Sequence, residues 1–132
     1  MSKPFSWPTR VYYEDTDAGG VVYYANYLRF MERARTEWLR AVGVEHDQLR
    51  AEHGIIFVVV SAEIQFQSPA KFNDALEVSV SVTQVKNASM TFAQDVTRDD
   101  ELLCRATVRA GTVDSATFKP RRLPTHVKQA ML

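Results

Sequence analysis

The sequence predicts an α+β fold in which an antiparallel sheet wraps around one long helix. A single amphipathic segment, residues 25–42, is long enough for several helical turns. A series of strand-like segments with alternating polarity follows it. No linker, repeat or low-complexity tract divides the 132 residues, so we expect one domain over 1–132.

The elements around the helix differ in composition. Residues 7–13 are rich in aromatic and β-branched side chains and predict a strand. Residues 14–20 are acidic and end in two glycines, which predicts a loop, because Asp and Gly disfavour helix and strand interiors. The helix has an apolar stripe and a C-capping glycine at Gly43; the stripe is Leu28, Met31, Ala34 or Arg35, Trp38 and Val42.

The rest of the chain is mostly strand-like. After a short helical turn over 47–52, residues 55–60 form a continuous β-branched run that predicts a central strand covered on both faces. This strand continues to residue 66, and alternation then predicts three more strands, over 76–83, 90–96 and 102–110. For the tail from residue 117 we expect a last short strand or an arm.

One helix cannot cover a sheet of this size together with its edges. Unpaired strand edges and a second apolar face need another partner. We therefore expect a homo-oligomer, a dimer or a tetramer.

Composition excludes several classes of function. Lys and Arg number 16, as do Asp and Glu, and a general nucleic-acid binder would carry a basic excess. No apolar run approaches the roughly 20 residues of a membrane span, and the N-terminus lacks the apolar region of a signal peptide. The one cysteine, Cys104, excludes an intrachain disulfide and lies in the apolar register of a strand. We expect a cytoplasmic protein in which this thiol is buried and inert.

The candidate chemistry lies just before the long helix. Asp15, Asp17, Gly19 and Gly20 precede a helix start, whose first N–H groups have no partner within the helix and carry partial positive charge. A thioester needs a polarised carbonyl and a carboxylate that supplies a base or a nucleophile. By spacing alone the two aspartates are equivalent, and they are also typical of a turn. A Mg²⁺ or Mn²⁺ site would use both carboxylates, but no further acidic ligands are evident, so we expect no metal.

The surrounding residues carry a specific resemblance. The string Tyr13-Glu14-Asp15-Thr16-Asp17-Ala18-Gly19-Gly20-Val21-Val22-Tyr23, within residues 10–37, resembles the 4-hydroxybenzoyl-CoA thioesterase-like branch of the hotdog superfamily. It is most similar to the tol–pal-associated acyl-CoA thioesterases, and the resemblance extends to Ser68-Pro69-Ala70 and to the tail over 119–124. It implies a hotdog fold and hydrolysis of a short-chain or aromatic acyl-CoA, without metal or redox cofactor. Acyl carrier protein is a possible alternative carrier of the acyl group.

The resemblance also implies roles for individual residues. It places the catalytic aspartate at Asp17, as nucleophile or as general base, and the backbone N–H that polarises the carbonyl at Tyr24. Gly19 and Gly20 shape the turn, while Asn26 either fixes the loop or caps the helix.

Two implications concern the neighbourhood of the site. Family sites lie at a subunit interface, and Lys86 and Arg121 are candidates to bind the phosphates of coenzyme A. Tol–pal-associated members often have His where this chain has Tyr24, so no imidazole role transfers to that position.

Two other functions remain open. A hotdog hydratase or dehydratase would use His with an acidic partner, and no His lies near the loop. A non-catalytic module would hold an acyl carrier or a lipid enzyme without cleaving a thioester. Release of free thiol across a panel of acyl-CoAs separates these alternatives.

Overall fold

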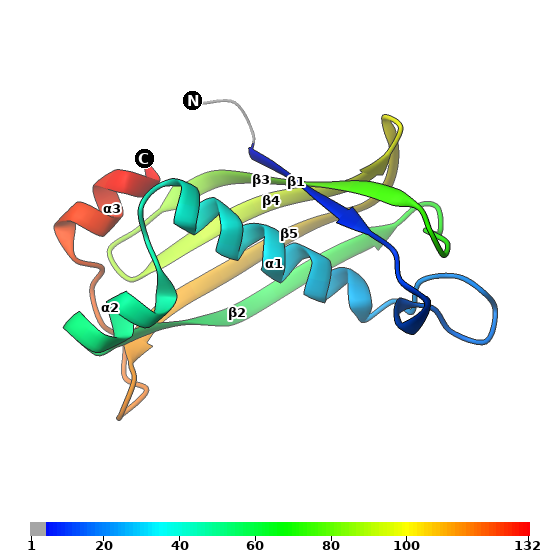
Figure 1. Cartoon of the computed structure of the whole chain (residues 1–132). Coiled ribbons are helices and arrows are strands. Elements are labelled where there is room, and N and C mark those ends of the chain that lie inside the picture. Colours follow the sequence, from blue (N-terminus) through cyan, green and yellow to red (C-terminus); the bar gives the residue numbers. More distant parts are fainter. Residues whose placement is uncertain (1–4) are drawn as a thin grey trace.

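A five-stranded antiparallel sheet curves around the long helix α1 (Figure 1). The computed structural model describes residues 5–132. The strands are β1 (Phe5–Arg10), β2 (Ile55–Phe66), β3 (Ala75–Val85), β4 (Ser89–Arg98) and β5 (Glu101–Asp114), in the order β1-β3-β4-β5-β2. The helices are α1 (Asn26–Ala41), α2 (His46–His53) and α3 (Thr125–Met131). This arrangement is the predicted hotdog fold.

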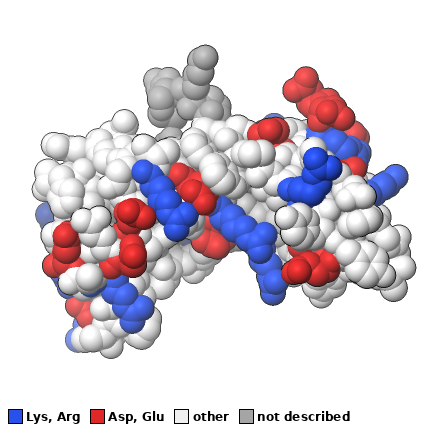
Figure 2. All heavy atoms as spheres, viewed as in Figure 1, with Lys and Arg blue, Asp and Glu red and all other residues white. Residues whose placement is uncertain are grey.

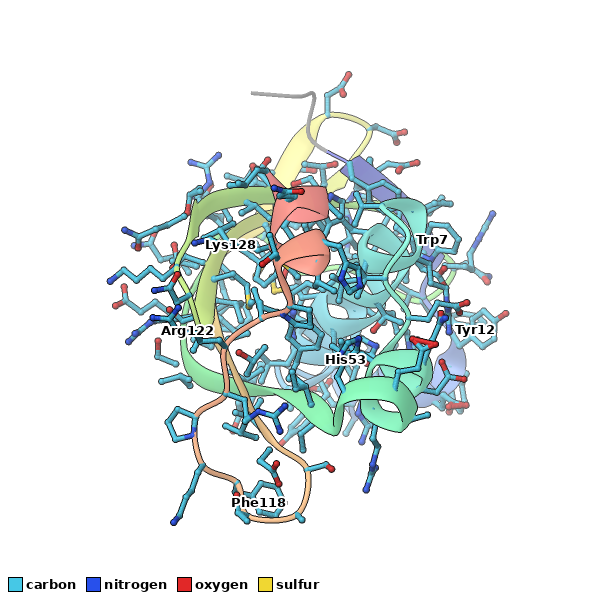
Figure 3. All side chains as sticks on the ribbon, turned by 90° about the vertical axis from the view of Figure 1, so that its left-hand side faces the viewer. Trp7, Tyr12, His53, Phe118, Arg122 and Lys128 are labelled. Atoms are coloured by element: carbon cyan, nitrogen blue, oxygen red, sulfur yellow. The ribbon has the colours of Figure 1, made fainter. Side chains whose placement is uncertain are left out.

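The core lies between α1 and the concave face of the sheet. Strands β3 and β4 alternate as predicted, with their inward side chains buried against the helix, among them Leu76, Val78, Val80, Met90, Phe92 and Val96. The buried arc of α1 is wider than the predicted stripe: Tyr27 and Phe30 are buried, whereas Leu28 is 43% exposed. The sheet causes this shift, since it reaches around the sides of the helix, as the view from the α2 and α3 end shows (Figure 3).

Strand β2 corrects one prediction. Residues 55–60 do not form a central strand, because β2 pairs only with β5 and lies at the edge of the sheet. The register shifts between Val59 and Ser61, so that Val60 forms a β-bulge. Before the bulge the odd-numbered Phe57 faces α1. After the bulge the even-numbered Phe66 faces α1 instead, and the centre of its ring lies 5.4 Å from that of Tyr27. The apolar run over residues 55–60 is therefore continuous for two reasons. The bulge changes which residues of β2 face the helix, and the edge of β2 is not covered by another strand.

A buried amide ties α1 to the middle of the sheet. Gln94 of β4 is 1% exposed, and its Nε2 donates to the Met31 carbonyl at 3.0 Å. Its Oε1 accepts a hydrogen bond from Arg35 Nη1 at 2.9 Å. Because an unpaired buried amide would be costly, these two bonds hold the helix at one position along β4.

The ends of two elements differ from the prediction. The first strand stops at Arg10, and the chain turns into a 3₁₀ helix at Tyr13–Asp15. The tail forms only one isolated bridge, between Val113 and Pro120, and then the helix α3, which the sequence analysis missed. Buried Val127 and Met131 anchor α3.

The single thiol and the helices bear on two further expectations. Cys104 is fully buried, as predicted, and burial raises its pKa to about 11, which disfavours the reactive thiolate. Among residues 5–132, none of the helices combines the length and apolarity that a bilayer crossing requires.

The turn between β4 and β5 gives a prediction on stability. Asp99 and Asp100 both have positive φ, of 49° and 67°, a conformation that favours Gly at the second position. We expect Asp100→Gly to stabilise the fold by about 0.5–1 kcal/mol and to raise Tm by about 2–4 °C. Thermal unfolding followed by circular dichroism measures the change. Asp100→Asn, which removes the same charge, is the control; an equal gain there would assign the effect to electrostatics.

Candidate active site

The acidic loop is a small β-hairpin that leads directly into α1. Its rungs are the Tyr23 N–H to Asp15 carbonyl bond (2.9 Å), the Thr16–Val22 bridge and the Asp17 N–H to Val21 carbonyl bond (2.9 Å). The Gly20 N–H closes the tip on the Asp17 carbonyl at 3.0 Å. Asp17 thus lies at the tip of the hairpin, and Figure 1 shows this segment beyond the N-terminal end of α1.

The structure makes the two aspartates different. Asp15 is 8% exposed, and its two oxygens accept hydrogen bonds from the Tyr12 N–H (2.8 Å) and Asn26 Nδ2 (2.9 Å). Asp17 is exposed, and its Oδ1 accepts from the Gly19 N–H at 2.8 Å. Its Oδ2 has no hydrogen-bond partner among residues 5–132. Asp15 therefore holds the loop, whereas Asp17 presents an oxygen to solvent.

The start of α1 leaves two N–H groups open. Ala25 occupies the N-cap position without a side-chain cap. The N–H groups of Tyr24 and Ala25 donate to no group that the structure describes, while the Asn26 N–H donates to the Tyr23 carbonyl at 2.8 Å. Asn26 does not cap the helix, because its amide is used on Asp15. An open N–H at Tyr24 with the helix dipole behind it suits a developing negative charge.

The two glycines have different structural reasons. Gly20 has φ of +80°, which an L side chain rarely adopts. A Cβ at Gly19 would lie 3.3 Å from Asp17 Oδ1, so a side chain there would press on the carboxylate. Both glycines thus preserve the shape of the hairpin tip.

Residues 68–74, here called the platform, form hydrogen bonds with one strand of the hairpin. The Val22 N–H donates to the Ala70 carbonyl at 2.9 Å, and Val21 bridges to Lys71. The Ala70 N–H in turn donates to the Tyr27 hydroxyl at 3.0 Å, which ties the platform to α1. Arg98 Nη1 forms an ion pair with Asp74 Oδ2 of the platform, at 2.6 Å.

An aromatic hollow adjoins the helix start. It has a volume of about 250 Å³ and is lined by Val22, Tyr24, Tyr27, Phe66, Gln67, Ser68 and Pro69. Sequence reasoning missed Tyr27 and Phe66 as wall residues: Phe66 lies in the apolar register of its strand, whereas Tyr27 lies outside the predicted stripe of the helix. Their pairing across the hollow depends on the tertiary packing of α1 against β2.

The predicted phosphate-binding residues lie elsewhere in the chain. Lys86 is in the turn between β3 and β4, at the opposite end of β3 from the platform. Arg121 is engaged by the protein, with Nη1 on Asp114 Oδ2 (2.8 Å) and Nη2 on the His53 carbonyl (3.1 Å). The neighbouring Arg122 and Lys128 lie at this same end of the molecule (Figure 3). One chain therefore brings Asp17, Gly19, Gly20, Tyr24 and Asn26 together, without Lys86 or Arg121.

Comparison with known proteins identifies the family. The model of the thioesterase-like superfamily matches residues 11–131. The acyl-CoA thioesterase YbgC of Haemophilus influenzae is 47% identical over 130 residues, which cover 98% of this chain and 96% of that protein.

Solved structures agree with this match. A probable thioesterase from Bartonella henselae has a TM-score of 0.89 at 34% identity, over 92% of this chain and all of that one. A variant of 4-hydroxybenzoyl-CoA thioesterase, in complex with 4-hydroxybenzoyl-CoA, shares the fold with a TM-score of 0.90 at 20% identity, over 99% of this chain and 100% of that one. The chain thus belongs to the thioesterase-like superfamily, as its sequence predicted.

Proposed function

We propose that this chain hydrolyses acyl-CoA thioesters with Asp17 as the catalytic carboxylate and the Tyr24 N–H as the group that polarises the carbonyl. The general activity, that of an acyl-CoA thioester hydrolase, follows from the family and from the near full-length similarity to YbgC. The roles of single residues, a short-chain or aromatic acyl group and acyl carrier protein as an alternative carrier are the finer parts of the proposal.

The observation that carries the residue roles is the contrast between the two aspartates. Both oxygens of Asp15 are occupied by protein donors, whereas Asp17 Oδ2 is open at the hairpin tip. In the same hairpin the Tyr24 N–H is open at the start of α1. A carbonyl oxygen at that N–H would be polarised by the helix end, and the aromatic hollow beside it would receive the acyl group.

Asp17 can act in the reaction by either of two routes, and atoms and charge balance in both. In one, Asp17 takes a proton from water as the water oxygen bonds to the carbonyl carbon. In the other, a carboxylate oxygen of Asp17 attacks that carbon, and water later cleaves the resulting anhydride. In both routes the carbon–sulfur bond breaks, and the coenzyme A sulfur leaves and takes up a proton.

Substitution of the two aspartates tests the assignment. Asp17→Asn keeps the oxygen that accepts from the Gly19 N–H and changes only the open position, so we expect normal folding. Turnover should fall by about 10²–10⁴-fold, because the base or nucleophile is lost. Release of free thiol from acyl-CoA, with Tm from thermal unfolding, measures both effects.

Asp15→Asn is the matched control. The substitution replaces one acceptor oxygen by an NH₂ group, which then faces the Tyr12 N–H or the Asn26 Nδ2 donor. We therefore expect a loss of stability of about 1–3 kcal/mol. Turnover of Asp17→Asn within a few-fold of the parent would contradict the catalytic role of Asp17. Retained acyl-CoA binding without any hydrolysis by the parent chain would favour the binding module instead.

We further propose that the chain works as a homo-oligomer, at least a dimer, joined through the edge of β2. The other edge of the sheet, β1, is short and contains Pro8, which cannot donate to a new strand. Strand β2 is longer and has no proline, and Val59 and Val60 are 56% and 57% exposed. Leu28 and Phe66 add exposed apolar surface beside this edge.

Such a dimer would complete the site. A two-fold axis through the middle of β2 pairs the two strands antiparallel and brings the Asp17 end of one copy beside the α2 and α3 end of the other. That end carries Lys86, Arg121 and Arg122, while on the face with α1 acidic and basic side chains are interspersed (Figure 2). The proposal thereby brings the predicted phosphate-binding residues Lys86 and Arg121 of one copy to the Asp17 end of the other.

A charge in the middle of β2 tests this interface. Near a two-fold axis a residue meets its own copy, so Val60→Lys would place two like charges together. We expect the variant to be smaller than the parent by light scattering after size-exclusion chromatography, and to lose turnover. Gln129→Lys, on the exposed side of α3, is the control and should keep the parental size. A monomeric parent, or an unchanged size for Val60→Lys, would contradict the interface.

A further inference from the structure

Two more hollows lie between α1 and β2, farther along the helix than the aromatic one. The first, about 340 Å³, lies between Leu28 and Arg29 of the helix and Ala62 of β2. Ala62 is four residues from Phe66 on the same strand face, about 13 Å along β2, so this hollow follows the aromatic one along the strand without sharing a lining residue with it. The second, about 120 Å³, shares Glu32, Arg35 and Val59 with the first and ends among Leu39, Phe57 and Phe92. Together they form a mostly apolar trough between α1 and β2.

Arg35 presents unused donors at the inner end of this trough. Its Nη1 donates to Gln94 Oε1 at 2.9 Å, and its guanidinium carbon lies 6.0 Å from the centre of the Phe92 ring. The guanidinium forms no ion pair with an acid in the part of the chain that the structure describes. No buried side-chain nitrogen there lacks a hydrogen-bond partner, so the unpaired Nε and Nη2 are not fully buried, and Arg35 lines both hollows of the trough.

The charges at this end of the trough balance. Glu32 lines the same hollow as Arg35, and its Oε2 accepts from the Thr36 hydroxyl at 2.6 Å. His46 also lines it, edge-on to Phe57, and desolvation lowers the pKa of His46, so the imidazole is neutral at pH 7. In this inner hollow one cation, Arg35, and one anion, Glu32, remain, while Arg29 lines the other hollow of the trough. A ligand group with a full charge would be attracted by one and repelled by the other, whereas a hydroxyl can accept from Arg35 and donate to Glu32.

The distance to the reaction centre sets the size of the ligand. Tyr24 and Arg35 are eleven residues apart, which is about 16 Å along a helix. Long helical side chains lean toward the helix N-terminus, so the guanidinium lies nearer to Tyr24 than its backbone does. An acyl chain of medium length, longer than the short-chain or aromatic group of the proposed function, would span from a carbonyl at Tyr24 to Arg35.

We infer that Arg35 and Glu32 form a specificity subsite that selects acyl chains with a neutral hydroxyl at the far end. The inference rests on the proposed function, because it assumes that the carbonyl lies at Tyr24. It differs from that function in the part of the substrate that is read: the distal end of the chain rather than the thioester. A distal carboxylate is disfavoured by Glu32, and a plain methyl end leaves the Arg35 donors unpaired.

Paired substrates test the subsite. Straight-chain acyl-CoAs of graded length are compared with their ω-hydroxy and ω-carboxy derivatives, by kcat/KM from thiol release. At one medium length we expect the hydroxyl to raise kcat/KM about tenfold or more over the plain chain. Arg35→Met should bring this ratio close to one, and the ratio within one variant does not depend on how much of that variant is folded. Arg33→Met, an arginine on the exposed face of the same helix, should keep the parental ratio.

A second variant tests the subsite through an expected gain in activity on the ω-carboxy substrate. Glu32→Gln removes the anion and leaves Arg35 in place, so the ω-carboxy derivative should rise relative to the plain chain. The inference is wrong if the parent shows no hydroxyl preference at any length, or if Arg35→Met keeps that preference. It is equally wrong if Arg35→Met changes the size of the oligomer but not the ratio, because the guanidinium would then serve a subunit interface.

The outcome is separable from that of the proposed function. If no plain acyl-CoA is hydrolysed, the proposed function fails. Calorimetric affinities of the same substrate pairs then replace kcat/KM, with the same ratios expected and the same results overturning the subsite.

Discussion

A single helix has to fill the whole concave face of a five-stranded sheet, and most other features of the chain follow from this constraint. The sheet must curve to reach both sides of α1, and five residues of the helix are buried as a result: Tyr27, Phe30, Met31, Ala34 and Leu39. The Gln94 amide then fixes the helix along β4 through its two hydrogen bonds. Because α1 cannot slide, its N-terminus is held at one place relative to the platform of residues 68–74.

The site uses what the curved sheet leaves open. The hairpin over residues 15–23 is not part of the sheet, yet Asp15, the platform and the Tyr27 hydroxyl hold it against the helix start. Rigidity therefore comes from buried hydrogen bonds behind the hairpin, while Asp17 at its tip stays exposed. The sheet curves past α1 on the β2 side without closing, and the trough lies along that open side.

Local patterns in the sequence predicted the elements well, and tertiary relations poorly. The period-two alternation of β3 and β4 and the helix ending before Gly43 were confirmed, because each depends on residues close in sequence. The continuous run over residues 55–60 was assigned to a central strand, since hydrophobicity does not distinguish a doubly covered strand from an uncovered edge with a bulge. At the site, the resemblance to a family selected Asp17, and the structure adds a difference that spacing could not predict: only Asp15 has both oxygens occupied. The distance of Lys86 from Asp17 could not be predicted, because it depends on the length and direction of β3.

The bulge at Val60 has a consequence for assembly. A strand edge with uniform alternation offers several equivalent registers, since a shift by two residues restores the same facing. In β2 the facing reverses at Val60, so a shifted copy would put polar side chains of one half against apolar side chains of the other. In the proposed dimer the two bulges lie directly opposite each other, on the two-fold axis, in only one register. The bulge thus favours a closed dimer. Without it, a long unpaired strand edge would be prone to open-ended edge-to-edge association.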